Sequence, residues 1–334
     1  MKIIVDAMGG DNAPFEIVKG AISAAKEFNA HIILTGRVEE ILRCIEKMGL
    51  KELPAGVEIA NATEVIEMDE EPVMAYRKKK DSSMTVGLNM LKEGQGDAMV
   101  SAGSTGALLS GATLVVKRIP GVKRAALAPI LPNADKGVML IDCGANVECT
   151  PQYLLQFAYM GSCYTEFVRG IKSPRIGLLN NGTEKTKGTQ LQIETYELLE
   201  EAHTVGKLNF IGNVEAKDVM HGVCDVVVCD GYSGNVLLKA TEGAASFVMK
   251  EIKKTLTANI KTKIAALLVK KEVYDLKERM SADKVGGTAL LGISKPVIKA
   301  HGSSNADAIK SAIRQAITAA NSNMAEILEK NIAE

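Results

Sequence analysis

Apolar residues along this chain alternate between short runs typical of buried strands and longer stretches with a helical repeat. The strand-like runs lie at 2–6, 31–35, 57–60, 97–101, 126–131, 137–142, 175–179, 207–211, 225–229 and 297–300. Amphipathic helical stretches lie at 15–28, 38–48, 83–93, 105–116, 152–169, 189–201 and 305–330. This alternation predicts an α/β fold in which a mostly parallel sheet is flanked by helices. Ligands of such sheets bind beyond the carboxyl ends of the strands.

One region departs from this alternation. Residues 235–271 contain no convincing helix breaker, which predicts one helix of roughly 50 Å at ~1.5 Å per residue. A second helical stretch follows at 272–280, and we interpret 236–283 as a projecting helical hairpin for dimerisation and membrane contact. No Ser/Pro-rich linker divides the chain, so 1–334 reads as a single α/β domain or as two intimate subdomains.

A short phrase occurs twice, each time where a strand hands over to a helix. The copies are DAMVSAGSTGALL at 97–109 and DVVVCDGYSGNVLL at 225–238, with a constant offset that aligns Gly103 with Gly231 and Gly106 with Gly234. Glycines allow a tight turn, and the free N–H groups of the new helix favour an anion. The repeat therefore predicts a cleft with several helix N-termini, typical of an enzyme that handles phosphate.

Four further glycine-rich loops follow predicted strands, at 6–11, 142–146, 180–188 and 301–305. If the sheet is parallel, all six loops open on one edge. No GxGxxG follows the first strand, and Ile293, before Ser294, stands where a Walker-type loop needs Lys, so nicotinamide and P-loop sites are not supported. Lys185 and Lys187 in the fourth loop, Lys239, and the pair Lys299 and His301 are basic residues at these loops.

Composition narrows the class of protein. The chain has 40 basic and 40 acidic residues, no Trp and only 4% aromatic residues, which disfavours nucleic-acid binding. Its six cysteines show no metal-ligand spacing, so no metal site is expected. The opening MKIIVDAMGGD reads as a strand rather than a signal peptide, and no apolar run is long enough to span a bilayer. We expect a cytoplasmic protein.

Two basic segments suggest partners. The run at Arg77, Lys78, Lys79 and Lys80 is either a docking patch for an acidic protein or a solvated helix face. Seven lysines and one acid lie between 250 and 271, beside apolar residues at helical spacing: Leu256, Ile260, Ile264, Leu267 and Leu268. This pattern fits a helix on an anionic bilayer or a dimer interface. We expect the proximal helix to pair with its mate and the tip to contact lipid.

The loops together resemble those of a known family. DAMGGD at 6–11, RKKKDSSM at 77–84, SAGSTGAL at 101–108, DCGAN at 142–146, LLNNGTEKTKG at 178–188, FIGNVE at 210–215, DGYSGNVLLKATEG at 230–243 and PVIKAHGSSN at 296–305 are similar to the bacterial phosphate acyltransferases of phospholipid synthesis. The similarity runs in one register from Met1 to about residue 320.

The resemblance implies transfer of a long-chain acyl group from acyl carrier protein to inorganic phosphate, forming acyl phosphate. It also implies a fold like that of isopropylmalate dehydrogenase and phosphotransacetylase, a homodimer, no metal or other cofactor, and peripheral contact with the membrane. A membrane enzyme would then pass the acyl group to glycerol 3-phosphate. The alternatives are a phosphotransacetylase-like enzyme using coenzyme A, a dehydrogenase of the isopropylmalate type, and a phosphate-binding scaffold without activity.

The chemistry of this reaction assigns roles to the loop residues. The candidate catalytic residues are Lys185, Asp230, Asn235 and His301. The candidate substrate-binding residues are Asp6, Gly9, Gly10, Asp11, Ser104, Thr105, Gly106, Asn146, Asn180, Lys187, Ser233, Gly234, Lys239 and Ser303. Lys185 or Lys187 would neutralise phosphate, His301 or Asp230 would handle a proton, and the two helix N-termini would serve phosphate and oxyanion.

Overall fold

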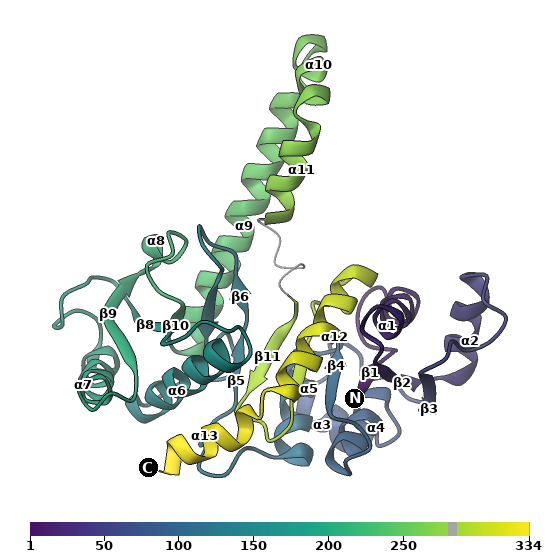
Figure 1. Cartoon of the computed structure of the whole chain (residues 1–334), viewed down its shortest axis with the longest axis horizontal. Helices are drawn as coiled ribbons and strands as arrows, with labels where there is room; N and C mark the ends of the chain where they lie inside the picture. The colour runs from purple at the N-terminus through teal and green to yellow at the C-terminus, as the bar shows by residue number, and fades with distance from the viewer. Residues whose placement is uncertain (280–285, 334) are drawn as a thin grey trace.

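A computed structural model describes residues 1–279 and 286–333, and its strands form two sheets rather than one (Figure 1). The first sheet has the order β3-β2-β1-β4-β12-β11-β5. Its strands are β1 (Lys2–Asp6), β2 (His31–Gly36), β3 (Val57–Asn61), β4 (Ala98–Ser101), β5 (Ala126–Ala128), β11 (Thr288–Leu291) and β12 (Val297–Lys299). Only β11 runs against its neighbours. We call this sheet and its helices the first lobe.

The second sheet has the order β6-β7-β10-β8-β9 and forms the second lobe. Its strands are β6 (Ile130–Leu131), β7 (Val138–Ile141), β8 (Arg175–Asn180), β9 (Asn209–Glu215) and β10 (Val226–Val228). All pairings are parallel except that of the edge strand β6 with β7. The predicted α/β class is confirmed, but the expected single open edge is wrong, because the glycine-rich loops are divided between two sheets.

Amphipathic helices cover both lobes. They are α1 (Phe15–Phe28), α2 (Val38–Lys47), α3 (Pro72–Lys78), α4 (Ser83–Lys92), α5 (Thr105–Gly111), α6 (Pro151–Phe167), α7 (Gln190–Thr204), α8 (Ala216–Val219), α12 (Ala306–Asn321) and α13 (Met324–Ala333). A π-helical turn at Ala112–Val116 extends α5. Helix α12 packs on α1 in the first lobe, and α13 packs on α6 in the second. The carboxyl-terminal helices therefore tie the lobes together (Figure 1).

Some predicted boundaries differ from the structure for local reasons. The run 126–131 is divided at Pro129, which lacks an N–H group, and the chain passes there from one sheet to the other. The stretch 305–330 divides at Asn323, whose φ of 50° cannot continue a helix. Strand β11 at 288–291 and helix α3 at 72–78 are short elements that the sequence pattern did not reveal.

A helical hairpin projects from the body (Figure 1). It consists of α9 (Gly231–Leu256), α10 (Ile260–Leu268) and α11 (Lys270–Arg279). The prediction of one unbroken helix over 235–271 is wrong: Asn259 caps α10 in a capping box with Thr262, which ends α9 at a turn. Residues 280–283 of the predicted hairpin lie outside the described residues. None of the helices over 1–279 and 286–333 is long and apolar enough to cross a membrane.

Candidate active site

A cleft of about 680 Å³ lies where the carboxyl ends of strands from both lobes meet. Its lining includes Lys299, at the end of β12, and Cys143, which follows β7. Six of the predicted site residues line it: Asp11, Thr105, Asn235, Lys239, His301 and Ser303. The structure therefore brings together residues that lie nearly 300 positions apart in the chain.

The first glycine-rich loop supports the cleft from the first lobe. The N–H of Asp11 donates to the Gly302 carbonyl at 2.8 Å, and Gly10 adopts a φ of 107° that favours glycine. A Cβ on Gly9 would lie 2.7 Å from the backbone nitrogen of Gly103. These loops touch so closely that Gly9 and Gly10 shape the wall rather than leave room for a ligand.

Asp6 lies beneath this loop and is 1% exposed. Its carboxylate accepts a 2.6 Å hydrogen bond from the Ser101 hydroxyl and a 3.3 Å bond from the Met8 N–H. Burial raises the pKa of Asp6, and the hydrogen bond from Ser101 is the largest opposing effect. Asp6 does not line the cleft, so its predicted contact with substrate becomes a supporting role for the 6–11 loop.

Lys299 is a cleft residue that was not among the predicted site residues. Its side chain lines the cleft although the residue is only 7% exposed, and Nζ donates to the carbonyl oxygens of Ala102, at 3.3 Å, and Ala300. No carboxylate among residues 1–279 and 286–333 forms an ion pair with it within 4.0 Å. Burial lowers the pKa of Lys299 to about 8, while Asp6 and Asp11 oppose this shift. The sequence signal was a Lys inside the apolar run VIKA.

His301 and Ser303 form a small hydrogen-bonded unit beside Lys299. The Ser303 N–H donates to His301 Nδ1 at 3.3 Å, and the Ser303 Oγ lies 2.9 Å from the same nitrogen. A donor at Nδ1 favours the neutral tautomer that carries its proton on Nε2. Both residues line the cleft, so this unit can hold or transfer a proton there.

The start of α9 contributes from the second lobe, although several of its predicted site residues serve the fold. Asp230 caps the helix by accepting 2.8 Å hydrogen bonds from the Ser233 N–H and hydroxyl. A Cβ on Gly231 would lie 2.6 Å from the Asn146 carbonyl oxygen. The Asn146 amide donates to Ala125 O at 2.8 Å and to the buried carboxylate of Asp142 at 3.0 Å. Gly234 is likewise packed on the 142–146 loop.

The next turns of α9 face the cleft. Asn235 and Lys239 line it, and Lys239 forms a 2.8 Å ion pair with Glu242 that is open to solvent. Across the cleft, Ser104 caps α5 by accepting from the Ala107 N–H at 3.5 Å, and Thr105 lines the cavity. Gly106 packs instead against Pro72 of α3. The members of the repeated phrase that reach the cavity are thus Thr105, Asn235 and Leu238.

The 180–188 loop is not brought to the cleft lining. Lys185 pairs with Glu200 on α7, and its Nζ lies 5.2 Å from the centre of the Tyr196 ring. The Asn180 side chain donates to the Lys187 carbonyl at 3.0 Å, which closes the loop on itself. Neither Lys185, Lys187 nor Asn180 lines the cavity.

Lys185→Ala therefore tests the sequence-based assignment of the phosphate cation. Because Lys185 already has an exposed carboxylate partner, we expect the KM for phosphate to change by less than about twofold, the effect of a surface ion pair. Steady-state kinetics with varied phosphate measure this value. A rise of tenfold or more would return Lys185 to the site.

The thiol in the cleft is protonated at neutral pH. Burial raises the pKa of Cys143, and the carboxylate of Asp142 raises it further. A thiol in this state is a poor nucleophile, which disfavours a covalent acyl-cysteine intermediate. Among the described residues, no three His, Cys, Asp or Glu side chains are grouped as they would be around a metal ion.

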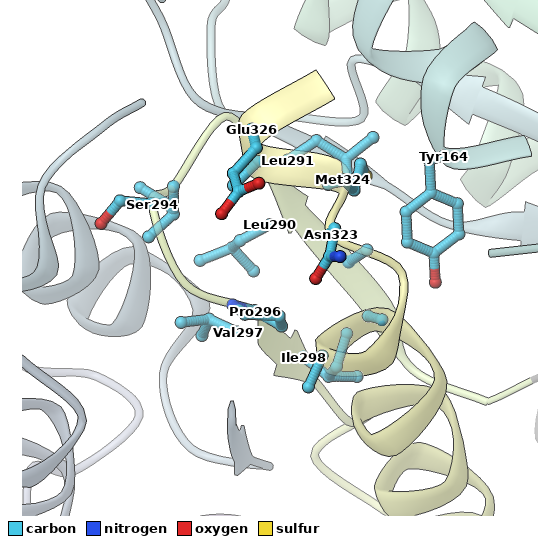
Figure 2. Close-up of a pocket in the computed structure, with 15 residues that line it drawn as sticks. Tyr164, Leu290, Leu291, Ser294, Pro296, Val297, Ile298, Asn323, Met324 and Glu326 are labelled. Carbon is cyan, nitrogen blue, oxygen red and sulfur yellow. The ribbon is translucent and has the colours of Figure 1, made fainter. Parts of the chain in front are cut away.

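A second, smaller cavity of about 180 Å³ lies where strand β11 turns into β12 (Figure 2). It is lined by the β11–β12 turn, including Ser294 and Pro296, and by Asn323 and Met324 at the α12–α13 joint. The cleft instead contains Thr288 and Lys299, at the other ends of the same two strands. The second cavity is therefore separate from the candidate active site.

The predicted surface segments occupy two distinct places. Arg77, Lys78 and Lys80 are exposed at the end of α3, whereas Lys79 is partly buried and pairs with Glu70. Met68 precedes this helix and lines the cleft, and α3 packs on α5, whose first residue, Thr105, also lines it. At the far end of the hairpin, the side chains of Ile260, Ile264, Leu267 and Leu268 are 58% to 80% exposed, and Leu256 is partly buried.

Comparisons with known proteins agree with this fold and identify related sequences. The family model described as "Fatty acid synthesis protein" matches residues 1–327. The chain is 45% identical to a phosphate acyltransferase of Clostridium acetobutylicum, over 100% of this chain and 99% of that protein. It is 49% identical to a phosphate acyltransferase of Oceanobacillus iheyensis, over 95% of this chain and 92% of that protein.

Two solved structures share the architecture. A phosphotransacetylase from Streptococcus pyogenes superposes with a TM-score of 0.67 at 21% identity, covering 97% of this chain and 94% of that one. A branched-chain phosphotransacylase from Enterococcus faecalis gives a TM-score of 0.57 at 13% identity, covering 95% and 99%. At these identities the likeness concerns the fold.

Proposed function

This chain belongs to the phosphate acyltransferase family, and from that premise we propose that it transfers a long-chain acyl group from acyl carrier protein to inorganic phosphate. A phosphate oxygen attacks the thioester carbonyl carbon, the carbon–sulfur bond breaks, and the leaving thiolate takes a proton. The products are acyl phosphate and free carrier protein. The acyl phosphate then serves phospholipid synthesis.

The observation that carries this proposal is the buried ammonium of Lys299 in the cleft. Two of its three hydrogens have backbone acceptors, Ala102 O and Ala300 O, and it has no carboxylate in ion-pair contact among the described residues. An anionic phosphate oxygen satisfies the remaining hydrogen and offsets the cost of burying the charge. Held there, phosphate is aligned for attack, which accounts for much of the rate of such a reaction.

The remaining cleft residues suit the later steps. The thioester carbonyl develops an oxyanion, and the Asn235 amide and the Lys239 ammonium are the donors that α9 offers to the cavity. The Nε2–H of His301 donates a hydrogen bond to the leaving sulfur, with Ser303 fixing the tautomer. The proton that the thiolate takes comes from the P–OH group of hydrogen phosphate, which loses it as the acyl phosphate forms. Asp230, Ser233 and Asn146 position these groups by holding the start of α9.

The lowered pKa of Lys299 gives the reaction a pH signature. Because only the ammonium form attracts phosphate, we expect the KM for phosphate to rise about fivefold between pH 8 and pH 9 as Lys299 loses its proton. An ordinary Lys would give no change below about pH 10. Initial rates with varied phosphate at each pH measure this effect, and a constant KM up to pH 10 would remove Lys299 from the phosphate site.

The sign of the linked stability effect separates this loss from unfolding. The pKa of Lys299 is about 8 in the folded protein and 10.5 as the ordinary value, so the unfolded chain binds more protons between these values. The contribution of Lys299 to the free energy of unfolding therefore rises with pH over this range. Weaker phosphate binding and greater stability from the same group is a combination that general unfolding does not produce.

Acyl carrier protein docks, in this proposal, on the exposed basic residues Arg77, Lys78 and Lys80 of the α3 segment. The helix α3 packs on α5, which begins at the cleft, and the carrier protein expected from the family resemblance is acidic. Lys79 has a structural role through Glu70, so it is excluded from the contact. The exposed Met74 adds an apolar surface beside the charges.

Reversing two of these charges tests the docking surface. We expect Arg77→Glu with Lys78→Glu to raise the KM for the acyl carrier protein substrate at least about tenfold at low salt, because two attractive contacts become repulsive. The KM for phosphate stays unchanged. Lys51→Glu with Lys172→Glu applies the same charge change at other exposed positions. Equal effects from both pairs would contradict a local docking patch.

The hairpin carries the surfaces proposed to bind a second copy of the chain and the membrane. Phe247 and Val248 on the stem of α9 are 64% and 47% exposed, which suits pairing with a second copy in a homodimer. The α10 tip, with Ile260, Ile264, Leu267 and Leu268 among lysines, suits an anionic membrane surface. Contact with the membrane delivers acyl phosphate to a membrane acyltransferase that acylates glycerol 3-phosphate.

Release of free thiol from palmitoyl-acyl carrier protein, with and without inorganic phosphate, tests the function directly. We expect release to require phosphate and the acyl phosphate to be trapped by hydroxylamine. Release without phosphate, or none, would overturn the proposal. Transfer from acetyl-CoA in preference to the palmitoyl donor would favour the phosphotransacetylase-like alternative.

A further inference from the structure

The lining of the cleft has a polar part and an apolar part. Charged and polar groups come from the first lobe, at Asp11, Thr105, Lys299, His301 and Ser303, and from α9, at Asn235, Lys239 and Glu242. The apolar part comes from the segment that crosses between the lobes, with Leu127, Pro129, Ile130 and Leu131, and from Leu238 on α9. We call these latter residues the apolar wall.

The backbone of the apolar wall has little hydrogen-bonding capacity left for a ligand. Leu127 donates its N–H to the Asp142 carboxylate at 2.8 Å and accepts from the Cys143 N–H at 3.0 Å. Pro129 has no N–H, and its carbonyl accepts from Leu140 at 3.0 Å. Ile130 and Leu131 pair with β7. A surface with satisfied backbone and aliphatic side chains favours a hydrocarbon over a polar ligand.

The position of the wall is fixed by both lobes. β5 is an edge strand of the first sheet and β6 is an edge strand of the second, so the segment joining them is held on each side. Leu238 extends the wall onto α9, one turn beyond Asn235. The wall therefore includes the segment between the two sheets and the first turns of α9, at the base of the hairpin.

We infer that the apolar wall is the binding site of the acyl chain, with the acyl carbonyl at the Lys299 end and the alkyl chain against Leu127–Leu131 and Leu238. This assignment rests on the proposed phosphate acyltransferase reaction, whose product has one anionic end and one hydrocarbon end. A cavity of about 680 Å³ is in the usual range for such ligands. No Phe, Tyr or Trp lines the cleft within the described residues, so a stacked nucleotide base is not favoured there.

Substitution of Leu238 tests the wall, because this residue lies at the partly exposed end of the cavity. We expect Leu238→Trp, which fills the space, to lower kcat/KM for a palmitoyl donor at least about tenfold and to change that for a butyryl donor less than about twofold. Leu238→Asp gives the same selective loss. Leu114→Trp is the matched control, since Leu114 is 53% exposed and does not line the cleft.

The possible outcomes distinguish a failure of the acyl-chain assignment from a failure of the proposed function. Equal losses with palmitoyl and butyryl donors would overturn the wall while leaving the reaction intact. Absence of phosphate-dependent transfer by the unmodified protein with every donor would overturn the proposed function itself. Circular dichroism of each variant identifies misfolding.

A photoreactive probe gives a second readout that needs no variant. A palmitoyl phosphonate, which mimics acyl phosphate but resists hydrolysis, carries a diazirine at the end of its chain. We expect cross-linked peptides from 127–131 or from the start of α9. Labelling confined to the cavity at the β11–β12 turn (Figure 2) would place the chain elsewhere and overturn the inference.

Discussion

Lys299→Met raises the KM for phosphate at least about tenfold in our expectation and leaves the KM for the acyl carrier protein substrate nearly unchanged. The ammonium is buried and its hydrogen bond to an anion is charge-assisted, which is worth ~1.5–3 kcal/mol when lost. Met retains the length and apolar stem of Lys, so the packing beneath the cleft is preserved. Steady-state kinetics with phosphate and acyl donor varied in turn measure the two constants.

Two further variants serve as controls for Lys299→Met. Lys217→Met removes a lysine that is 70% exposed and paired with Glu215, and we expect it to behave as the unmodified protein. Lys299→Arg keeps a cation that does not lose its proton near pH 8, so partial activity in this variant shows no rise of the phosphate KM between pH 8 and pH 9. Unchanged phosphate kinetics in Lys299→Met would contradict the assigned role.

Leu267→Glu with Leu268→Glu releases the protein from anionic vesicles in our expectation, with a partition coefficient reduced at least about a hundredfold. The two side chains are 73% and 80% exposed at the hairpin tip, and burying each in lipid contributes ~1.5–3 kcal/mol. The added carboxylates also repel the anionic surface. Vesicle sedimentation measures partitioning, while thiol release with free carrier protein should stay within about twofold.

The oligomeric state decides between the two uses of the hairpin. Sedimentation of the double variant without vesicles should match the unmodified protein, because the tip is not the dimer interface in this proposal. Dissociation of the dimer on substitution at the tip would assign these leucines to the interface instead. Phe247→Glu on the stem is the complementary change, and we expect it to weaken dimerisation.

Local sequence patterns predicted most elements because each pattern records which face is buried. Helix α1 begins and ends as expected at 15–28, and its buried residues Ile17, Ala21 and Ala24 follow a helical repeat. The division into two sheets was not predictable in the same way. Strand β12 lies between β4 and β11, and that order is set by contacts between residues some 200 positions apart, which leave no local pattern.

The repeated phrase predicted that its two copies occupy equivalent places in the fold. Many of its residues, however, have a structural role and do not contact the cavity. Asp97 accepts a 2.7 Å hydrogen bond from the N–H of Lys2 at the start of the neighbouring strand, and Asp225 accepts one at 2.8 Å from Arg175 in the same way. The two copies are thus corresponding strand–helix units of the two lobes. Their glycines mostly permit close backbone approach, which sequence alone does not distinguish from a ligand pocket.

The same limit of sequence-based reasoning explains why Lys185 was selected as a site residue and Lys299 was not. Lys185 stands in the 180–188 loop, whose eight other residues are all polar or glycine, and it was selected as a site residue. Lys299 stands in an apolar run that was predicted to be a strand, and it was noted only as a basic residue beside a loop. Burial reverses this ranking, because an ammonium enclosed by protein must find a partner while an exposed one has solvent. Only the tertiary structure shows which lysine is enclosed.

The order of segments in the first sheet has a consequence for synthesis on the ribosome. Its strands β11 and β12 come from residues 288–299, after all strands of the second lobe and after the hairpin, and β12 lies inside the sheet between β4 and β11. The nascent first lobe thus lacks two central strands and helix α12 until translation is almost complete, whereas β7 to β10 emerge as one continuous stretch. The second lobe is therefore the unit able to fold during translation, and the amino-terminal segment must wait for the carboxyl-terminal one.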